Sequence, residues 1–108
     1  LASMPRSANT LAVFGMLADK DIAGVIDAVK SGVTQWFIAS AGGPRGAGTV
    51  QLAAALAGAG VTVPVTRCGD IAAAWHAACN SAAEDDKIIV FGSFLTVAAV
   101  MRERQRRA

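Results

Sequence analysis

Apolar runs of strand length alternate with segments of helical periodicity along the whole chain. The apolar runs, each five or six residues long, are at 11–15, 34–39, 61–65 and 87–92. The segments with helical spacing are at 21–32, 49–59, 69–83 and 93–107. Strands that alternate with helices at this spacing form a mostly parallel sheet with right-handed crossovers. The pattern therefore predicts an α/β fold with helices on both faces of the sheet.

Details of the pattern assign places to the strands and faces to the helices. Pro64 lies inside the third run, which points to an edge strand because proline cannot donate to a ladder. Four consecutive apolar residues in the run at 87–92 predict burial on both faces. A doubly wound sheet with strand order 3-2-1-4 would place the first and fourth strands side by side. On the last helix the residues expected to face inward are Phe94, Val97, Ala98 and Met101.

Charge and cysteine content narrow the classes of partner. The chain has 108 residues, enough for one domain, and a net charge of +2. The arginines are concentrated at the C-terminal end, in the segment 102–107, so the body of the domain gives no reason to expect nucleic acid. No apolar run approaches the roughly 20 residues of a membrane span, and we expect no membrane partner. Cys68 and Cys79 are expected to be free thiols in a reducing, cytoplasmic compartment.

Asp19, Lys20 and Asp21 follow the first strand, where open α/β sheets bind ligands. The aspartates can cap the following helix by accepting hydrogen bonds from its free N–H groups. Capping does not explain Lys20, because a cation is disfavoured at a helix N-terminus. A lysine there is suited to hold a carboxylate or phosphate together with the helix N–H groups. Capping and ligand contact both remain open for this turn.

A second polar turn follows the fourth strand, at Gly92 and Ser93, with Thr96 at the same end. Gly92 permits a tight turn, and Ser93 can either cap the last helix or donate its hydroxyl and N–H to an anion. With strand order 3-2-1-4, Lys20 and Ser93 would flank one crevice. Arg45 sits on a glycine-rich loop after the second strand, where it is either solvated or part of a site.

The motifs of independent chemistry are missing from the sequence. Gly43 and Gly48 have the separation of a P-loop, but Thr49 stands where the phosphate-binding lysine is required. Gln51 replaces the last glycine of a dinucleotide fingerprint. The single histidine, His76, is expected at the surface or at a boundary, and no spacing suits a metal ion. We therefore expect no catalytic residue and no metal ligand in this chain.

The order of several short segments resembles a known family. The segment 12–24, with sequence AVFGMLADKDIAG, is similar to the start of the C-terminal domain of bacterial folylpolyglutamate synthase, which is often bifunctional with dihydrofolate synthase. The other matching segments are Gly43-Pro44-Arg45-Gly46-Ala47, Ala74-Trp75, Val90-Phe91-Gly92-Ser93-Phe94 and Thr96-Val97. This family belongs to the Mur ligase superfamily. The resemblance implies a Rossmann-like three-layer sandwich in residues 11–108, with residues 1–10 as the end of a truncated helix and a linker.

The resemblance also implies a function. Such enzymes use ATP and Mg to phosphorylate a pteroate or folate carboxyl, and the amino group of L-glutamate then attacks the acyl phosphate. By resemblance, Lys20 would neutralise a glutamate carboxylate and Ser93 would donate hydrogen bonds to it. Asp19, Asp21, Arg45, Gly92 and Thr96 would support them. The implied partners are the N-terminal ATP-binding domain of the same polypeptide, L-glutamate, and a folate or dihydropteroate.

The sequence departs from the family pattern in two ways. Leu95 stands where bacterial members commonly have histidine, so we assign no catalytic role to that position. The P-loop and the Asp-x-Ala-His-Asn-Pro segment of the family are absent. We therefore expect a domain that is inactive alone and binds no ATP or Mg by itself. The alternatives are a non-catalytic Rossmann-like or flavodoxin-like ligand-binding module and a domain that serves only interdomain packing.

Overall fold

The computed structural model describes residues 9–18, 20–40, 46–92 and 94–107, which form an α/β domain around one parallel sheet. The strands are β1 (Thr10–Gly15), β2 (Gln35–Ile38), β3 (Val65–Arg67) and β4 (Lys87–Gly92). The α-helices are α1 (Ile22–Val29), α2 (Thr49–Gly58), α3 (Ile71–Ser81) and α4 (Phe94–Arg107), with a 3₁₀ turn at Lys30–Gly32. The strand order is β3-β2-β1-β4 and every pairing is parallel. The predicted fold class and strand order are therefore confirmed.

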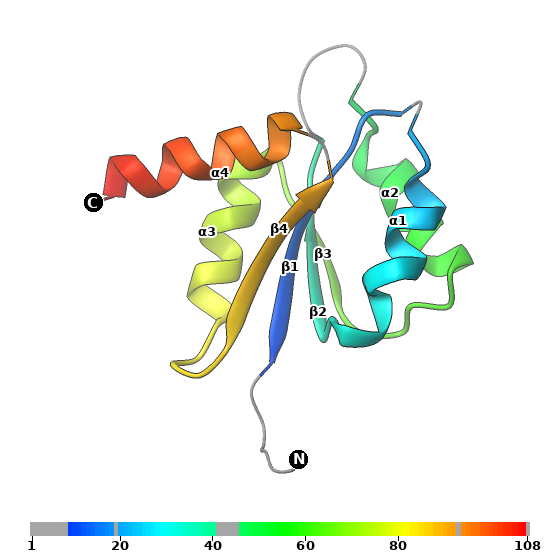
Figure 1. Ribbon diagram of the computed structural model, residues 1–108, viewed down its shortest axis with the longest axis horizontal. Coiled ribbons are helices and arrows are strands. Elements are labelled where there is room, and N and C mark those ends of the chain that lie inside the picture. The colour runs from blue at the N-terminus through cyan, green and yellow to red at the C-terminus, as the bar shows by residue number, and fades with distance from the viewer. Residues whose placement is uncertain (1–8, 19, 41–45, 93, 108) are drawn as a thin grey trace.

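Helices cover both faces of the sheet, as Figure 1 shows. Helices α1 and α2 lie on one side, and α3 and α4 lie on the other. The two faces of β1 alternate accordingly: Phe14 belongs to the core under α1 and α2, and Val13 belongs to the core under α3. Phe14, Trp36 and Phe91 pack ring against ring, with centroids 4.9–5.8 Å apart. This aromatic cluster joins three strands on one face of the sheet.

Among the described residues, no helix is both long and apolar enough to span a membrane.

Aspartate side chains cap two of the helices. The Asp21 side chain accepts a hydrogen bond from the Gly24 N–H at 3.1 Å and caps α1. Asp70 accepts one from the Ala73 N–H at 2.8 Å and caps α3. Both carboxylates also complement the positive end of a helix dipole. Helix α1 ends at Val29, three residues before the predicted end, because the chain tightens there into the 3₁₀ turn.

The third strand differs from its prediction at 61–65. Strand β3 begins at Val65, and the segment before it is not a strand. Val61 and Val63 still pack against the core, but they do so from the connection after α2. Pro64 accepts a hydrogen bond from the Trp36 N–H at 3.0 Å and lies just before the strand. The predicted edge position of the strand is confirmed by the sheet order.

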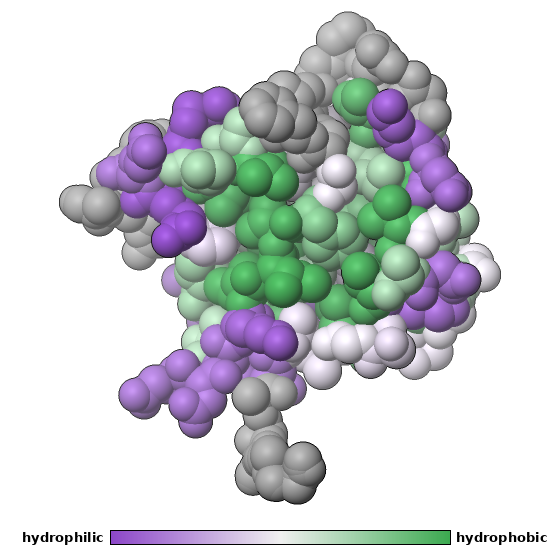
Figure 2. Space-filling model, in the orientation of Figure 1, coloured by the Kyte–Doolittle hydropathy of each residue, from purple (hydrophilic) through white to green (hydrophobic). Residues whose placement is uncertain are grey.

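The prediction that the fourth strand is buried on both faces is wrong. Strand β4 lies at the other edge of the sheet, and its four apolar residues are half-buried. Ile89 and Phe91 pack toward the core under α1 and α2, and Ile88 and Val90 pack toward the core under α3 and α4. Figure 2 shows hydrophobic surface in the middle of the view, where Figure 1 shows the strands between the two helical layers.

Helix α4 turns a different face to the sheet from the one predicted. Thr96 and Val100 are buried, at 0% and 3% exposure, whereas Met101 is 55% exposed. Val97 and Ala98 are half-buried, and the side chain of Phe94 lies outside the described residues. The Glu103 side chain continues the inward face at 12% exposure and lies 2.8 Å from the His76 ring. The apolar pattern failed here because two polar residues, Thr96 and Glu103, occupy the inward spacing.

Asp86 joins the chain before β1 to the turn before β4. Its carboxylate accepts hydrogen bonds at 2.8 Å from the backbone N–H groups of Asn9 and Ala83. These bonds, that from Ala83 first, hold the pKa of Asp86 below its ordinary value of 3.8. Because the folded state then binds fewer protons than the unfolded state, the group stabilises the fold above about pH 5. This stabilisation is lost as the pH falls through the lowered pKa.

Substituting Asp86→Asn should therefore flatten the acid limb of the stability curve. The variant is expected to melt lower than the wild type at neutral pH, because one amide oxygen replaces two charged acceptors. The two melting temperatures should converge only as the pH falls below 3.8 and through the lowered pKa of Asp86. Thermal unfolding followed by circular dichroism across the acid range measures this. Asp85→Asn changes an exposed neighbour and is the matched control. Parallel curves for wild type and Asp86→Asn would contradict the assignment.

Candidate functional site

Three strand-to-helix junctions meet at the carboxyl end of the sheet. Gly15 and Gly92 end β1 and β4 and face each other in register. The turn after β1 is also tied to the loop before α2, through a bridge between Leu17 and Gly46. Ala47 strengthens that contact by donating its N–H to the Met16 carbonyl at 2.8 Å. The first, second and fourth junctions therefore form one connected edge, at the top of Figure 1.

Lys20 lies on the turn between β1 and α1, and its side chain is exposed. Its backbone is fixed on both sides: its N–H donates to the Leu17 carbonyl at 3.2 Å, and its carbonyl accepts from the Ile22 N–H at 2.8 Å. Asp21 is committed to capping α1, so capping explains this aspartate. Within the described part of the chain, the Lys20 ammonium has no ion-pair partner. The Lys20 ammonium is therefore free to contact an anion, whereas the N–H groups of Ile22 and Gly24 are already bonded to Lys20 and Asp21.

Gly92 and Thr96 hold the fourth junction against the first. Gly92 has a φ of +120°, and a side chain there would overlap the Gly15 carbonyl oxygen. The Thr96 hydroxyl donates to the same carbonyl at 2.8 Å from inside the first turns of α4. Both residues thus hold the ends of β1 and β4 together at this edge, and their supporting role in ligand binding stays a prediction. Ser93 directly follows Gly92 in the sequence.

Three of the expected site residues, Asp19, Arg45 and Ser93, lie outside the described residues. The adjacency of Lys20 and Ser93 therefore stays a prediction. The pairing of Gly15 with Gly92 places the strand ends that precede them side by side. His76 of α3 is half-buried, and its Nε2 lies 2.8 Å from the Glu103 carboxylate of α4. Its boundary position was expected.

Arg67 is a cation that sequence reasoning missed. It is the last residue of β3, so it also lies at the carboxyl end of the sheet. Its Nε donates to the Thr49 hydroxyl at 3.2 Å, which ties it to the first residue of α2. The signal was present in the sequence, but the third strand was placed at 61–65, and Arg67 then fell in a connection. Placing the strand after Pro64 would have shown it.

Cys68 follows Arg67 and could be taken for a nucleophile. Burial, and after it the nearby Asp70 carboxylate, raise the pKa of the Cys68 thiol. A raised pKa keeps the thiol protonated at neutral pH, and the thiol form is a poor nucleophile. Cys68 and Cys79 are both free. Among the described residues, no group of three His, Cys, Asp or Glu side chains could hold a metal ion.

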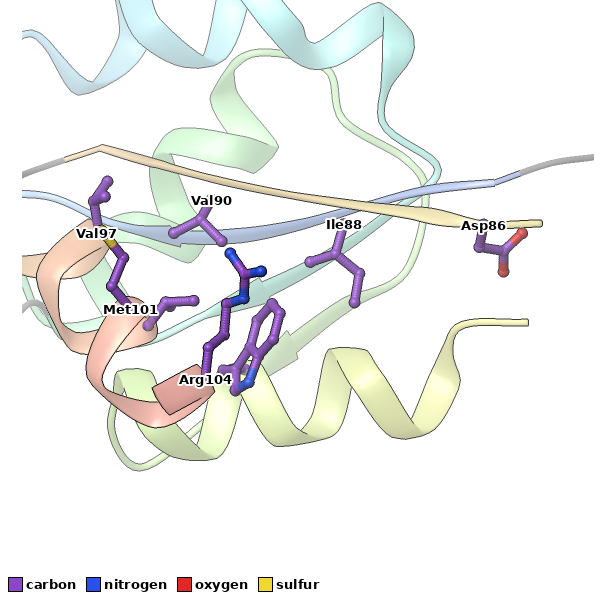
Figure 3. A pocket seen from close by; sticks show the side chains of 8 residues that line it. Asp86, Ile88, Val90, Val97, Met101 and Arg104 are labelled. Atoms are coloured by element: carbon purple, nitrogen blue, oxygen red, sulfur yellow. The ribbon is translucent and has the colours of Figure 1, made fainter. Parts of the chain in front are cut away.

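A groove of ≈ 590 Å³ lies elsewhere, between β4, α3 and α4 (Figure 3). Ile88 and Val90 of β4 and Val97 and Met101 of α4 line it, as Figure 3 shows. Trp75 of α3 is a further lining residue. Its lining is mostly apolar, with Asp86 and Arg104 as its charged residues. Lys20, the described residue that is expected to bind an anion, does not line it. The groove is therefore a consequence of the open edge of β4 and is separate from the candidate site.

The geometry of this edge can be compared with known proteins. Residues 1–94 match the family model described as "Mur ligase, glutamate ligase domain". The chain belongs to this family. The resemblance expected from the sequence is thereby confirmed, and the Rossmann-like sheet of this Mur ligase domain agrees with it.

Individual relatives agree with the family. The domain is 44% identical over 101 residues to the dihydrofolate synthase/folylpolyglutamate synthase of Escherichia coli K12, which covers 94% of this chain and 22% of that protein. It is also similar to the solved structure titled "E. coli FolC in complex with DHPP and ADP", at 42% identity and a TM-score of 0.82, covering 96% of this chain and 24% of that chain.

A third similar structure is a bifunctional folylpolyglutamate synthase/dihydrofolate synthase with Mn, AMPPNP and L-glutamate bound. It is 36% identical, with a TM-score of 0.78, and the match covers 91% of this chain and 23% of that chain. The Mur ligase domain thus spans about a quarter of the length of the relatives it matches.

Proposed function

We propose that this domain contributes the glutamate-binding edge of an ATP-dependent folylpolyglutamate synthase/dihydrofolate synthase. Such an enzyme joins L-glutamate to a folate or pteroate carboxyl through an acyl phosphate. The observation that carries the proposal is the connected carboxyl edge of the sheet, where a fixed turn presents the exposed Lys20. The chain also belongs to a family of glutamate ligase domains. A similar solved protein has L-glutamate bound, which supports glutamate as the ligand.

The chemistry of glutamate suits the residues of this edge. The substrate carries two carboxylates and one nucleophilic amine, so it needs cations and N–H donors that leave the amine free. The Lys20 ammonium would neutralise one carboxylate, and Ser93, which lies outside the described residues, would donate hydrogen bonds to it. Gly92 and Thr96 would keep the two turns together, and Asp21 would hold the start of α1.

ATP and Mg do not fit the residues of this chain. The glycine-rich loop has Thr49 where a P-loop needs lysine, and the described residues offer no metal cluster. We therefore assign nucleotide, metal and folate binding to the rest of a longer polypeptide, and place residues 11–108 as its C-terminal domain. The N-terminal ATP-binding part would then be the main partner of this domain. The free thiols suit a cytoplasmic location.

The isolated chain is expected neither to hydrolyse ATP nor to extend folates, and the full-length protein is expected to do both with glutamate. The reason is that the sequence given has no P-loop motif with which to bind a triphosphate. Release of ADP and incorporation of radiolabelled glutamate into dihydropteroate and tetrahydrofolate measure the two activities. Full-length protein with its P-loop lysine replaced is the inactive control. ATP turnover by the isolated chain, or a full-length protein that never incorporates glutamate, would contradict the proposal.

A further inference from the structure

Thr96 is the only polar residue in the fully buried set of the described chain. A buried hydroxyl is costly unless it makes a hydrogen bond. In a helix, the usual local partner of a threonine hydroxyl is the carbonyl four residues earlier, which here belongs to Gly92. The Thr96 hydroxyl instead donates at 2.8 Å to the Gly15 carbonyl, 81 positions away in the sequence. Valine would fill the same space without a hydroxyl. Packing alone therefore does not explain why a threonine makes this bond here.

The position of the acceptor suggests what the bond does. Gly15 is the last residue of β1, and the turn that carries Lys20 begins directly after it. Gly92 packs its backbone against the same carbonyl, and α4 starts two residues later. The Gly15 carbonyl is therefore the point at which the turn after β1 and the start of α4 are joined. Of these contacts, the Thr96 bond is the one made by a side chain.

We propose that Thr96 is a positioning residue for the glutamate site, acting by fixing the first turns of α4 against the turn that presents Lys20. This inference rests on the proposed function of that edge. Thr96 is fully buried and does not itself touch the substrate. Without the hydroxyl, the start of α4 loses its side-chain bond to the end of β1. Small shifts there would weaken a contact that depends on orientation.

The test uses the full-length protein that contains this domain, with the variants Thr96→Val and Thr96→Ser. Valine keeps the shape and removes the donor, whereas serine keeps the donor and loses a methyl group. We expect Thr96→Val to raise KM for glutamate about tenfold and to leave KM for ATP within about twofold. Thr96→Ser should restore KM for glutamate to within about twofold of the wild-type value.

The matched control is Thr34→Val. The Thr34 hydroxyl donates at 3.1 Å to the Thr10 carbonyl, so it makes the same kind of bond to the first residue of β1, at the opposite end of the sheet. Thr34→Val is expected to lower the melting temperature slightly and to leave KM for glutamate unchanged. If Thr96→Val does not fold, Thr96→Cys replaces it under the same criteria, because a thiol is a weak donor of similar size.

The outcomes separate this inference from the proposed function. If Thr96→Val lowers the melting temperature but leaves KM for glutamate unchanged, Thr96 is merely structural and the inference is wrong. It is also wrong if Thr96→Ser binds glutamate as poorly as Thr96→Val. Lys20→Ala is measured in parallel: if it too leaves KM for glutamate unchanged, the proposed function of this edge fails. If Lys20→Ala raises that KM and Thr96→Val does not, only the positioning role is lost.

Discussion

Gly92→Ala is expected to lower the unfolding free energy of the domain by about 2–4 kcal/mol. Two costs combine at this position. A residue with a side chain is strained at a φ of +120°. In addition, the new Cβ would overlap the Gly15 carbonyl oxygen and lie 3.0 Å from Cγ of Met16, and neither backbone nor buried side chain can easily withdraw. Urea unfolding of the isolated domain, followed by tryptophan fluorescence, measures the loss.

Gly60→Ala separates the two costs of the Gly92 substitution. Gly60 also has a positive φ, of +85°, but a Cβ there would meet nothing within 4 Å. It should therefore cost only the backbone strain, about 1 kcal/mol. The difference between the two variants reports the close approach of β4 to β1. Equal losses at Gly92 and Gly60 would show that the contact with the Gly15 carbonyl contributes nothing.

In the full-length enzyme, Lys20→Ala should reduce kcat/KM for glutamate roughly 10- to 150-fold. Such a loss corresponds to removal of one charge-assisted contact to a carboxylate, worth about 1.5–3 kcal/mol. KM for ATP should change little, because the proposed nucleotide site lies outside this domain. Lys20→Arg should restore activity only in part, since the forked guanidinium is larger and differently shaped. Steady-state kinetics with glutamate as the varied substrate measure these effects.

Lys87→Ala is the control for the loss of a positive charge. Lys87 is also exposed, but it begins β4 and thus lies at the opposite end of the sheet from Lys20. Its removal should leave kcat/KM for glutamate unchanged. Each substitution should alter the stability of the isolated domain by no more than about 0.5 kcal/mol, as is typical of exposed sites. If Lys20→Ala instead unfolds the domain and surviving enzyme has normal glutamate kinetics, Lys20 is structural.

Strands and helices could be predicted where hydrophobicity alone decides their place. Strands β1 and β4 match their apolar runs closely, because each run is bounded by polar or glycine residues. Strand β3 was misplaced because its Thr66 and Arg67 are exposed, and backbone pairing to β2 holds them. The open side of β4 was missed because an apolar run looks the same whether or not another element covers it.

The sequence was enough to predict where the candidate site lies, but not which contacts hold it together. The order of strands brought the turns after β1 and β4 to one edge, and the structure has that order. Thr96 was expected at the same end, but no periodicity could predict that its hydroxyl reaches Gly15. That contact depends on how deeply α4 packs against the sheet. In addition, a buried threonine breaks the apolar pattern from which the inward face of the helix is predicted. Arg67 was missed for a simpler reason, the misplaced strand.

The open edge of β4 also bears on the solubility of the domain. On the side away from β1, the described chain offers β4 no partner strand, and such an edge is a template for pairing with another molecule. The edge is short and bounded: exposed Lys87 and the acidic turn before it mark one end, and Gly92 turns the chain away at the other. The charge of Lys87 and the turn at Gly92 thus also hinder the exposed edge of β4 from pairing with a strand of another molecule.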